Sequence, residues 1–373
     1  MQVTVVGAGI GGLAVAVGLH RRGHDVTVLE RSPDLTAPGA GISLFANGLA
    51  ALGVLGLADE VRAVAAAYDS TLRTGQRQPS GRWLVEVPAS STQDLAVVHR
   101  QDLQRVLLGA LPAGTVRTGV TVTGVEHARG VVVDSSGGRT AGDLVVGADG
   151  LRSAVRGTFA RGASPRYAGY TAWRGVTEGA VDLLGGAGET WGRGERFGYV
   201  PLRDGRVYWF AVASVPAGTR FADEGAEVRR RFDHWHDPIP ALVAGTDPAA
   251  VLRHDIHDLG GRLPSFVQGR VALLGDAAHA MTPDVGQGGG QALEDAATLA
   301  VLCDGDLRAA LREYDRLRRP RTQAIARRAR MVGRVAQLGW APAAAARDLL
   351  LRAMPDAASA RAAAAVQRWD PPA

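Results

Sequence analysis

A glycine pattern near the start of the chain constrains its fold more than any other feature. The apolar, β-branched run Gln2–Val6 predicts a strand, and the glycine-rich segment GAGIGG follows it directly. An apolar helix is expected after these glycines, followed by a second strand at Asp25–Leu29. Together these elements make a βαβ unit, so the chain is predicted to be an α/β protein.

The spacing of the glycines indicates that this unit binds a dinucleotide. Gly7 permits a tight turn, Gly9 lets a pyrophosphate approach the backbone, and Gly12 lets the helix pack closely on the strand. The helix N-terminus then presents free N–H groups and a partial positive charge to the phosphates. Glu30 can accept hydrogen bonds from a ribose diol and disfavours a 2′-phosphate there, which leaves NAD or FAD. The alternative is a glycine-rich turn in an ordinary α/β fold.

Composition narrows the class of protein further. The chain has 373 residues, 46% hydrophobic and 21% charged, which is typical of a soluble globular protein of two closely packed domains. The net charge is +5, and arginine is the only basic residue besides histidine. This excess of arginine reflects either a compositional bias or a function in attracting anionic ligands. The arginines are dispersed and no nucleic-acid-binding motif occurs, so nucleic acid is not an expected partner. A lone Cys303, no zinc-like Cys/His spacing and no long apolar run indicate a cytoplasmic protein with neither a metal site nor a membrane span.

A second motif, GADGLRSAVR, follows the apolar strand expected at Asp143–Val146. Its Asp-Gly pair is compatible with a simple turn. Arg152, Ser153 and Arg156 follow at helical spacing, however, and this combination can hold phosphate or carboxylate groups at a turn.

The third motif, GDAAHAMTPDVGQGGGQALEDA, occupies Gly275–Ala296 and follows a strand expected at Arg270–Leu274. Asp276 is placed to accept a hydrogen bond from a ribose or ribityl hydroxyl. Pro283 ends any continuing helix. The run Gly286–Gly290 then begins a new helix.

In this order, the three motifs resemble those of the single-component FAD-dependent monooxygenases of the aromatic-hydroxylase type, the family of para-hydroxybenzoate, salicylate and urate hydroxylases. The resemblance covers most of the chain, and the last two motifs are specific to that family among dinucleotide-binding folds. It implies FAD as the cofactor and NADPH or NADH as a transient co-substrate. It also implies a Rossmann-type FAD-binding domain (GR2, para-hydroxybenzoate hydroxylase-like), a mostly antiparallel substrate-binding sheet domain and C-terminal helices.

The domain organisation is expected to be discontinuous, because the sequence between the second and third motifs is strand-like and rich in Trp and Tyr. The FAD-binding domain is assigned to residues 1–70, 95–165 and 255–335, the substrate-binding sheet to 71–94 and 166–254, and a helical tail to 336–373.

The resemblance implies a set of FAD contacts from all three motifs and from the segments between them. These are Gly7, Gly9, Gly11, Gly12, Glu30, Arg31, Ser43, Arg100, Val122, Asp149, Asp276, Gly286, Gln287, Gly288, Gly289 and Gly290. The role of the last glycines is physically reasonable, because reduced flavin carries negative charge near N1. A helix N-terminus offers that charge roughly 0.3–2 kcal/mol of stabilisation.

Three residues are expected to act on the substrate side of the flavin. Arg196 and Tyr208, on neighbouring predicted strands, resemble an arginine and a tyrosine that bind substrate in the urate-hydroxylase branch. Pro283 matches a proline whose carbonyl faces the reactive side of the ring. The alternative is an exposed arginine and a tyrosine packed in the core; Trp173 and Arg174 are weaker candidates.

Four further residues carry structural expectations. His279 is expected to pack behind the third motif rather than act as a base, because no carboxylate partner is placed to orient it. His254 and His257 resemble a metal cluster only loosely, and no metal is expected. Pro320 is expected to kink or restart the helix that begins at Leu307.

The resemblance implies a monooxygenase that uses NAD(P)H and O₂ to hydroxylate an aromatic or heteroaromatic small molecule through a flavin C4a-hydroperoxide. Three alternatives remain at this stage. They are an epoxidase acting on an alkene or a polyketide- or terpenoid-type product, a flavin reductase or oxidase, and a flavin-binding protein without activity. A monomer or homodimer is expected.

Overall fold

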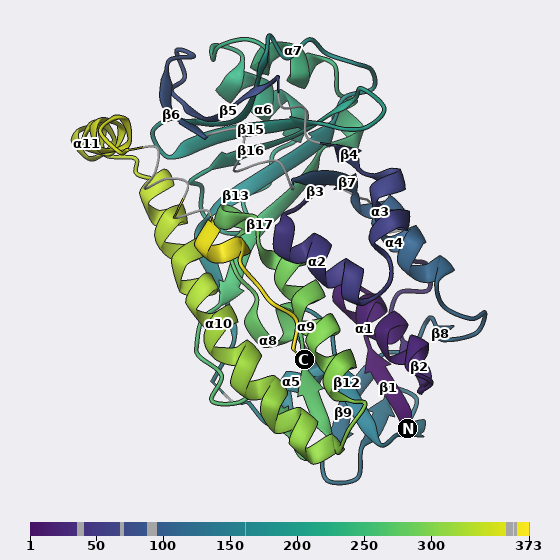
Figure 1. The fold of residues 1–373 in the computed structure, drawn as a ribbon. Helices are drawn as coiled ribbons and strands as arrows, with labels where there is room; N and C mark the ends of the chain where they lie inside the picture. The colour runs from purple at the N-terminus through teal and green to yellow at the C-terminus, as the bar shows by residue number, and fades with distance from the viewer. Residues whose placement is uncertain are drawn as a thin grey trace.

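Two large β-sheets occupy separate halves of the structure, one below and one above in Figure 1. The computed structural model describes residues 1–35, 41–67, 71–87, 95–160, 162–355, 361 and 364–372. Residues 88–94, which the sequence assigns to the substrate-binding sheet, lie outside the described residues. The lower sheet is mainly parallel and the upper one mainly antiparallel, which confirms the predicted α/β fold class.

The lower sheet aligns the ends of the strands that precede the three motifs. Its six strands, in the order β18-β19-β12-β1-β2-β8, are parallel except for β18 against β19. They are β1 (Gln2–Val6), β2 (Asp25–Leu29), β8 (Val116–Arg117), β12 (Leu144–Gly147), β18 (Val267–Gln268) and β19 (Val271–Leu273). Val6 pairs with Gly147, and Gly147 with Leu273. The three motif loops therefore leave the sheet at one edge, where ligands bind in open α/β sheets.

Helices of the lower half pack against one another through small residues. These are α1 (Ile10–Arg21), α2 (Ala46–Val54), α3 (Ala58–Val64), α4 (Arg100–Gly109), α5 (Ala154–Gly157), α8 (Asp276–His279) and α9 (Gly288–Leu302). A Cβ at Gly11 would lie 3.2 Å from that of Ala292, and one at Gly18 would lie 2.8 Å from that of Ala300. Because both pairs run in the same direction, α1 and α9 lie parallel, with their N-termini at the same end.

Two small sheets flank this half. One has the order β3-β7-β4, formed by β3 (Gly41–Leu44), β7 (Ala96–His99) and β4 (Ala66–Ala67). The other is formed by β9 (Val122–Glu126), β10 (Val131–Asp134) and β11 (Arg139–Ala141).

The upper sheet has seven strands, in the order β17-β13-β16-β15-β14-β5-β6, and only β14 and β5 run parallel among these pairs. They are β5 (Arg73–Arg77), β6 (Trp83–Val87), β13 (Pro165–Val176), β14 (Gly186–Trp191), β15 (Glu195–Pro201), β16 (Val207–Ala213) and β17 (Leu252–Leu259). The sheet therefore combines segments from both sides of the second motif. The exact domain boundaries stay a prediction.

Alternation along these strands gives the upper sheet two different faces. On the outer face, Trp173, Phe197 and Trp209 are fully buried beneath α6 (Glu224–Phe232) and α7 (Ile239–Ala244). The opposite face, called the inner face below, carries Arg196 and Tyr208 and is turned toward the lower half. The aromatic core thus leaves one face of the sheet free to meet the cofactor domain.

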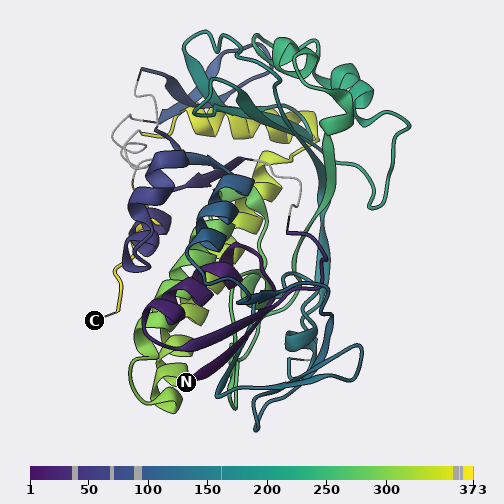
Figure 2. The ribbon, with the colours of Figure 1, turned by 90° about the vertical axis from the view of Figure 1, so that its right-hand side faces the viewer.

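A long helix, α10 (Leu307–Ala336), runs alongside both halves of the molecule (Figure 2). It continues through Pro320, so the helix does not restart there, and the other expectation for Pro320, a kink, stays a prediction. Pro320 is exposed, whereas Arg318 and Thr322 on either side of it are buried. Arg318 binds Glu294 and Asp295 of α9, which anchors α10 next to the proline.

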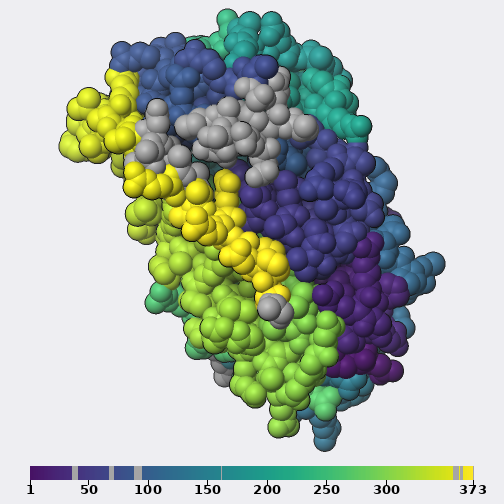
Figure 3. Space-filling model, viewed as in Figure 1, coloured from purple at the N-terminus to yellow at the C-terminus, as the bar shows by residue number. Residues whose placement is uncertain are grey.

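The end of the chain folds back over the surface. Helix α11 (Ala341–Arg352) packs beside β6 in the upper half. Residues 364–372 then run over the face between α10 and α2 (Figure 3). Val366 packs there against Ile325 and Ala329 of α10. Among the described helices, none is long and apolar enough to cross a membrane.

Candidate cofactor and substrate site

The first and second motif loops touch each other at the edge of the lower sheet. Gly7 has φ +104°, and a Cβ there would lie 2.5 Å from the carbonyl oxygen of Ala148. A Cβ at Gly12 would overlap the carbonyl oxygen of Gly7. These two glycines are therefore required by the protein's own backbone.

Gly9 differs from its neighbours, because a Cβ there would meet nothing within 4 Å. It is the N-cap of α1 and has no side-chain cap, and the first helical hydrogen bond runs from the Leu13 amide to its carbonyl. The amides of the first turn are thus left for a ligand. Open space beside uncapped amides fits the pyrophosphate of a dinucleotide.

Glu30 closes this loop from the second strand. Its carboxylate accepts hydrogen bonds from the amides of Ala8 (2.7 Å) and Ser32 (2.8 Å). Its neighbour Arg31 is exposed.

The other predicted FAD contacts between the first and second motifs lie on neighbouring elements. Ser43 lies on β3, which pairs with β7 immediately before Arg100, the exposed first residue of α4. Val122 is buried at the start of β9.

The second motif is held by its own side chains. Asp149 accepts hydrogen bonds from the Ser153 hydroxyl and the Val155 amide, which fixes the start of α5. Arg156 is buried and donates to the carbonyl oxygens of Leu151 (2.6 Å) and Ala277 (2.9 Å). Arg156 therefore ties the second motif to the backbone of the third, and the binding of a phosphate or carboxylate by Arg152, Ser153 and Arg156 together stays a prediction.

The third motif places a second uncapped helix N-terminus at the end of the lower sheet where the three motif loops meet. α9 begins at Gly288 without a side-chain cap, and its first helical hydrogen bond runs from the Gln291 amide to the Gln287 carbonyl. Gly286 has φ +64°, and a Cβ there would lie 2.9 Å from the ring of Phe45.

Some of the other residues of the third motif are buried, and others are exposed. Gln287 is buried, and its side-chain oxygen accepts from Asn47 (2.9 Å). Asp276 and Pro283 are exposed. An exposed acid beside a glycine-lined helix start fits a ligand with hydroxyl groups and a flat ring, as FAD has.

His279 lies behind this loop, as expected, but it does have a carboxylate partner. Its Nε2 lies 2.5 Å from Asp295 Oδ2, so the expectation that no acid orients it was wrong. Asp295 also accepts from the Gly275 amide (2.9 Å) and from Arg318 (2.6 Å). Although burial alone would raise it, His279 and Arg318 lower the pKa of Asp295. This cluster of His279, Asp295 and Arg318 could not be predicted from the sequence, because its members lie on three different helices.

Arg196 on β15 is almost fully buried, and protein groups engage its guanidinium. Nη2 donates to Asp284 (2.7 Å) and Nε donates to Gln337 (2.9 Å), while Nη1 lies 3.6 Å from Glu189. Burial alone would lower the pKa of Arg196, but Glu189 and Asp284 raise it, so the cation is retained. The partners that the structure gives Arg196 are therefore two carboxylates and an amide of the protein.

Asp284, which the sequence analysis did not select, is the centre of this cluster. It follows Pro283 directly in the short 3₁₀ helix η3 (Pro283–Val285) and also accepts from the Tyr170 hydroxyl (2.6 Å). Burial, with the charge of Asp284, raises the pKa of Tyr170, which stays protonated. Its place beside Pro283 was the signal that could have identified Asp284.

Tyr208 and Arg196 share the inner face but do not touch. Arg196 pairs with Val212, which lies four residues along β16 from Tyr208. Four residues of a strand span about 13 Å. Phe210 lies between them, against Gly198, where a Cβ would overlap its ring.

The surroundings of Tyr208 combine close packing with positive charge. A Cβ at Gly41 would lie 2.7 Å from the Tyr208 ring, so β3 lies directly against it. Burial raises the pKa of Tyr208, with Arg174 acting in the opposite direction. Burial, together with Arg174 and Arg100, lowers the pKa of His254 on the same face. This end of the inner face is thus electropositive.

The two histidines with adjacent acids do not form a metal site. His254 pairs with Ala172 and His257 with Tyr167, which puts the two side chains on opposite faces of β17. Among the described residues, no group of His, Cys, Asp and Glu could hold a metal ion.

Comparison with known proteins places this geometry in a class. Residues 1–329 match the family described as FAD binding domain. The chain belongs to this family and is an FAD-dependent monooxygenase that hydroxylates an aromatic substrate. The open glycine loop and the two uncapped helix starts are the features of this chain that fit the cofactor.

Relatives match over nearly the whole chain. The chain is 40% identical to the aurachin C monooxygenase/isomerase of Stigmatella aurantiaca, over 95% of this chain and 94% of the relative. It is 38% identical to an FAD-dependent urate hydroxylase of Klebsiella pneumoniae, over 88% and 89%. The crystal structure of Klebsiella pneumoniae HpxO complexed with FAD and uric acid superimposes with a TM-score of 0.88 at 31% identity, covering 98% of this chain and 96% of that one.

Proposed function

We propose that the aromatic or heteroaromatic substrate lies between the inner face and the η3 loop, and that O₂ and NADH or NADPH are its co-substrates. The arrangement that carries this proposal is the inner face itself. Arg196 with Asp284 stands at one end, Tyr208 with Arg174 at the other, and the Phe210 ring lies between them. An apolar floor with polar groups at both ends suits a flat ring that carries polar substituents.

The residues of this chain have different parts in that site. Tyr208 donates a hydrogen bond to a ring substituent, since its raised pKa keeps it protonated at neutral pH. Arg174 and Arg100 favour a substrate hydroxyl in its deprotonated, electron-rich form. Arg196 acts as a positioning residue, because it holds Asp284 and so fixes the adjacent Pro283 turn.

FAD supplies the oxygen-transfer chemistry when bound. The uncapped amides of α9 stabilise negative charge on its ring, and the aromatic residues of the inner face exclude water from the reacting groups. Relatives named for urate and for 3-amino-4-hydroxybenzoate support a hydroxylated ring as substrate. We place the enzyme in the cytoplasm, as a monomer or homodimer.

A substrate screen tests this function. Purified holoenzyme is given NADH or NADPH and a panel of hydroxylated aromatics and oxo-heterocycles, with hydrogen peroxide measured to detect uncoupling. We expect a substrate that stimulates NAD(P)H oxidation and gains one atom of ¹⁸O from ¹⁸O₂ on its ring. Oxygen on an alkene instead would establish the epoxidase, and peroxide as the sole product would establish the oxidase.

Arg196→Ala tests the positioning role in the same assay. We expect the variant to keep FAD but to release peroxide in place of hydroxylated product, because Asp284 and Glu189 lose their counter-ion beside the Pro283 turn. Coupled turnover equal to that of the wild type would remove Arg196 from the site.

A further inference from the structure

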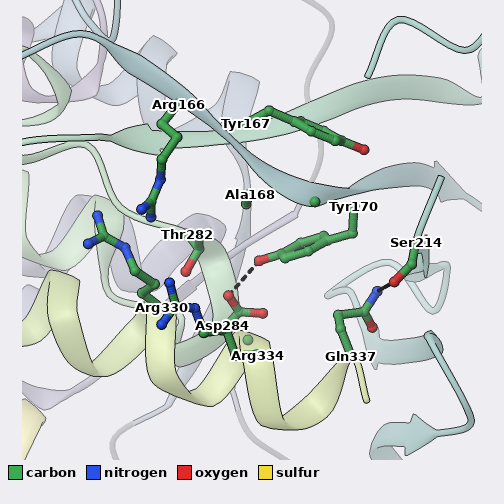
Figure 4. Close-up of a pocket in the computed structure, with 12 residues that line it drawn as sticks. Arg166, Tyr167, Ala168, Tyr170, Ser214, Thr282, Asp284, Arg330, Arg334 and Gln337 are labelled. Atoms are coloured by element: carbon green, nitrogen blue, oxygen red, sulfur yellow. Dashed lines mark hydrogen bonds between the residues drawn. The ribbon is translucent and has the colours of Figure 1, made fainter. Parts of the chain in front are cut away.

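A cavity of about 380 Å³ lies between β13 and the C-terminal part of α10 (Figure 4). It borders the cofactor loop through Thr282 and Asp284, the two neighbours of Pro283. Neither the glycine run Gly286–Gly290 nor Tyr208 lines it. The cavity therefore lies next to the inner-face site proposed for the substrate, and the two share Asp284 as part of their walls.

The cavity wall carries more positive than negative charge. Arg166 and Arg330 share one carboxylate, that of the buried Asp258, at 2.9 and 2.7 Å. Arg334 is exposed and makes no ion pair with any described residue. The acid that lines the wall itself, Asp284, is paired with Arg196. Two cationic charges on this wall thus lack a matching acid among the described residues.

The three arginines are arranged to bind one anionic group together. Figure 4 shows the guanidinium groups of Arg166, Arg330 and Arg334 gathered on one side of the cavity, with Tyr170 and Gln337 toward the other. Arg166 and Arg330 are held in place through Asp258, so little side-chain entropy remains to be lost when a ligand binds. Guanidinium groups bind phosphate oxygens through paired N–H donors.

An apolar surface continues outward from these arginines. A second hollow on α10 shares Arg330 and Arg334 with the cavity and is completed by Arg327, Met331 and Val335. Met331 is 61% exposed and Val335 is 41% exposed. A ligand that joins phosphate groups to flat rings matches both parts of this surface.

We propose that Arg166, Arg330 and Arg334 bind the phosphate groups of NADH or NADPH, with the nicotinamide directed toward the loop at Thr282–Asp284. The inference rests on the proposed function, which requires a nicotinamide reductant. It adds the location of that reductant, for which the sequence carries no second complete glycine fingerprint.

Arg334→Gln tests the site with little risk to the fold, since Arg334 has no ion-pair partner among the described residues. Arg312→Gln is the matched control, because Arg312 is also exposed on α10 and lies in its N-terminal half, away from the cavity. Binding of NADP⁺ and NAD⁺ to the FAD-loaded proteins is measured by titration calorimetry. The KM for NADPH, for NADH and for the aromatic substrate is measured in parallel.

We expect Arg334→Gln to weaken binding of the preferred nucleotide about tenfold, as for loss of one charge-assisted hydrogen bond, and to raise its KM equally. FAD content and the KM for the aromatic substrate stay at wild-type values, Arg334→Lys recovers part of the affinity, and Arg312→Gln changes nothing. A larger effect on NADP⁺ than on NAD⁺ places the 2′-phosphate in the cavity, and an equal effect places the pyrophosphate there.

Unchanged nucleotide affinity in Arg334→Gln, or an equal loss in Arg312→Gln, overturns the assignment. A raised KM for the aromatic substrate alone overturns it too, since the cavity would then bind that substrate. These failures are distinct from a failure of the proposed function, in which the wild-type flavin is not reduced by either nucleotide.

Discussion

Two glycines of the first motif have different roles: one leaves space for the ligand, and the other is required for the fold. Gly9 faces open space and has φ −70° and ψ 176°, which any residue can adopt, whereas a side chain on Gly12 would strike the Gly7 carbonyl. We expect Gly9→Val to fold with a near-normal melting temperature but without FAD, and Gly12→Val to lose both. Flavin absorbance and thermal melting measure this. Stoichiometric FAD in Gly9→Val would place the pyrophosphate elsewhere.

At this scale the sequence predicted the residues whose environment is local. The requirement for Gly7 and Gly12 follows from a turn of a few residues, and a spacing pattern expresses it. The partners of Arg196 lie 88 and 141 positions away along the chain, at Asp284 and Gln337. No local sequence pattern encodes such a contact. The sequence therefore predicted Arg196 as a site residue but did not predict the carboxylate that pairs with it.

Among the elements, α9 and α10 are joined by a buried charge network. Arg318 donates to Asp295 and Glu294, and all three side chains are almost completely buried. Arg318→Leu leaves two buried carboxylates with fewer partners. We expect a loss of about 3–5 kcal/mol in the free energy of unfolding, together with weaker FAD binding, because Asp295 also holds the Gly275 amide.

Arg319→Leu is the control for this network in denaturant unfolding. Arg319 is the next residue and pairs with Asp315 at a partly exposed position, so its removal is expected to cost about 1 kcal/mol or less. Equal losses in the two variants would show that the buried network contributes no more than a surface pair.

The elements that carry the motifs were predictable, because strands and helix starts are marked by apolar runs and glycines. The continuity of α10 was not. The helix-breaking effect of Pro320 can be read from the local sequence, because proline lacks a backbone N–H. The burial of Arg318 and Thr322 on either side of it depends instead on helices that come together only when the chain folds. The role of the inner face was not predictable either. The alternation of side chains along a strand predicts that a sheet has two faces, but it does not say which face is turned toward the FAD-binding domain.

For the whole molecule, acidification should reduce stability from near neutral pH downward. Burial lowers the pKa of four histidines, His24, His127, His236 and His254. The unfolded chain then binds more protons below the ordinary pKa of 6.5, so this stability is complete above that pH and is lost as the pH falls through the folded values. We expect the melting temperature of the holoenzyme to fall between pH 7.5 and 5.5.

His236→Gln provides the comparison for this pH profile. The histidine is partly buried, with its ring nitrogens near Thr190 (2.8 Å) and the Asp237 carbonyl (2.6 Å). Glutamine keeps a polar group there but does not titrate, so the slope should become shallower. A melting temperature that rises on acidification would reverse the sign of the argument.

The long helix α10 contacts both halves of the molecule, so the number of its residues between these contacts fixes which of its faces each half meets. Arg318 anchors α10 behind α9, while Gly333 lies against the Asp284 carboxylate and Gln337 binds Arg196 on the upper sheet. One residue inserted between these points would turn the far end by about 100° and displace it by about 1.5 Å. The number of residues from Arg318 to Gln337 is therefore fixed by the contacts at both ends of this stretch, and both sites depend on it.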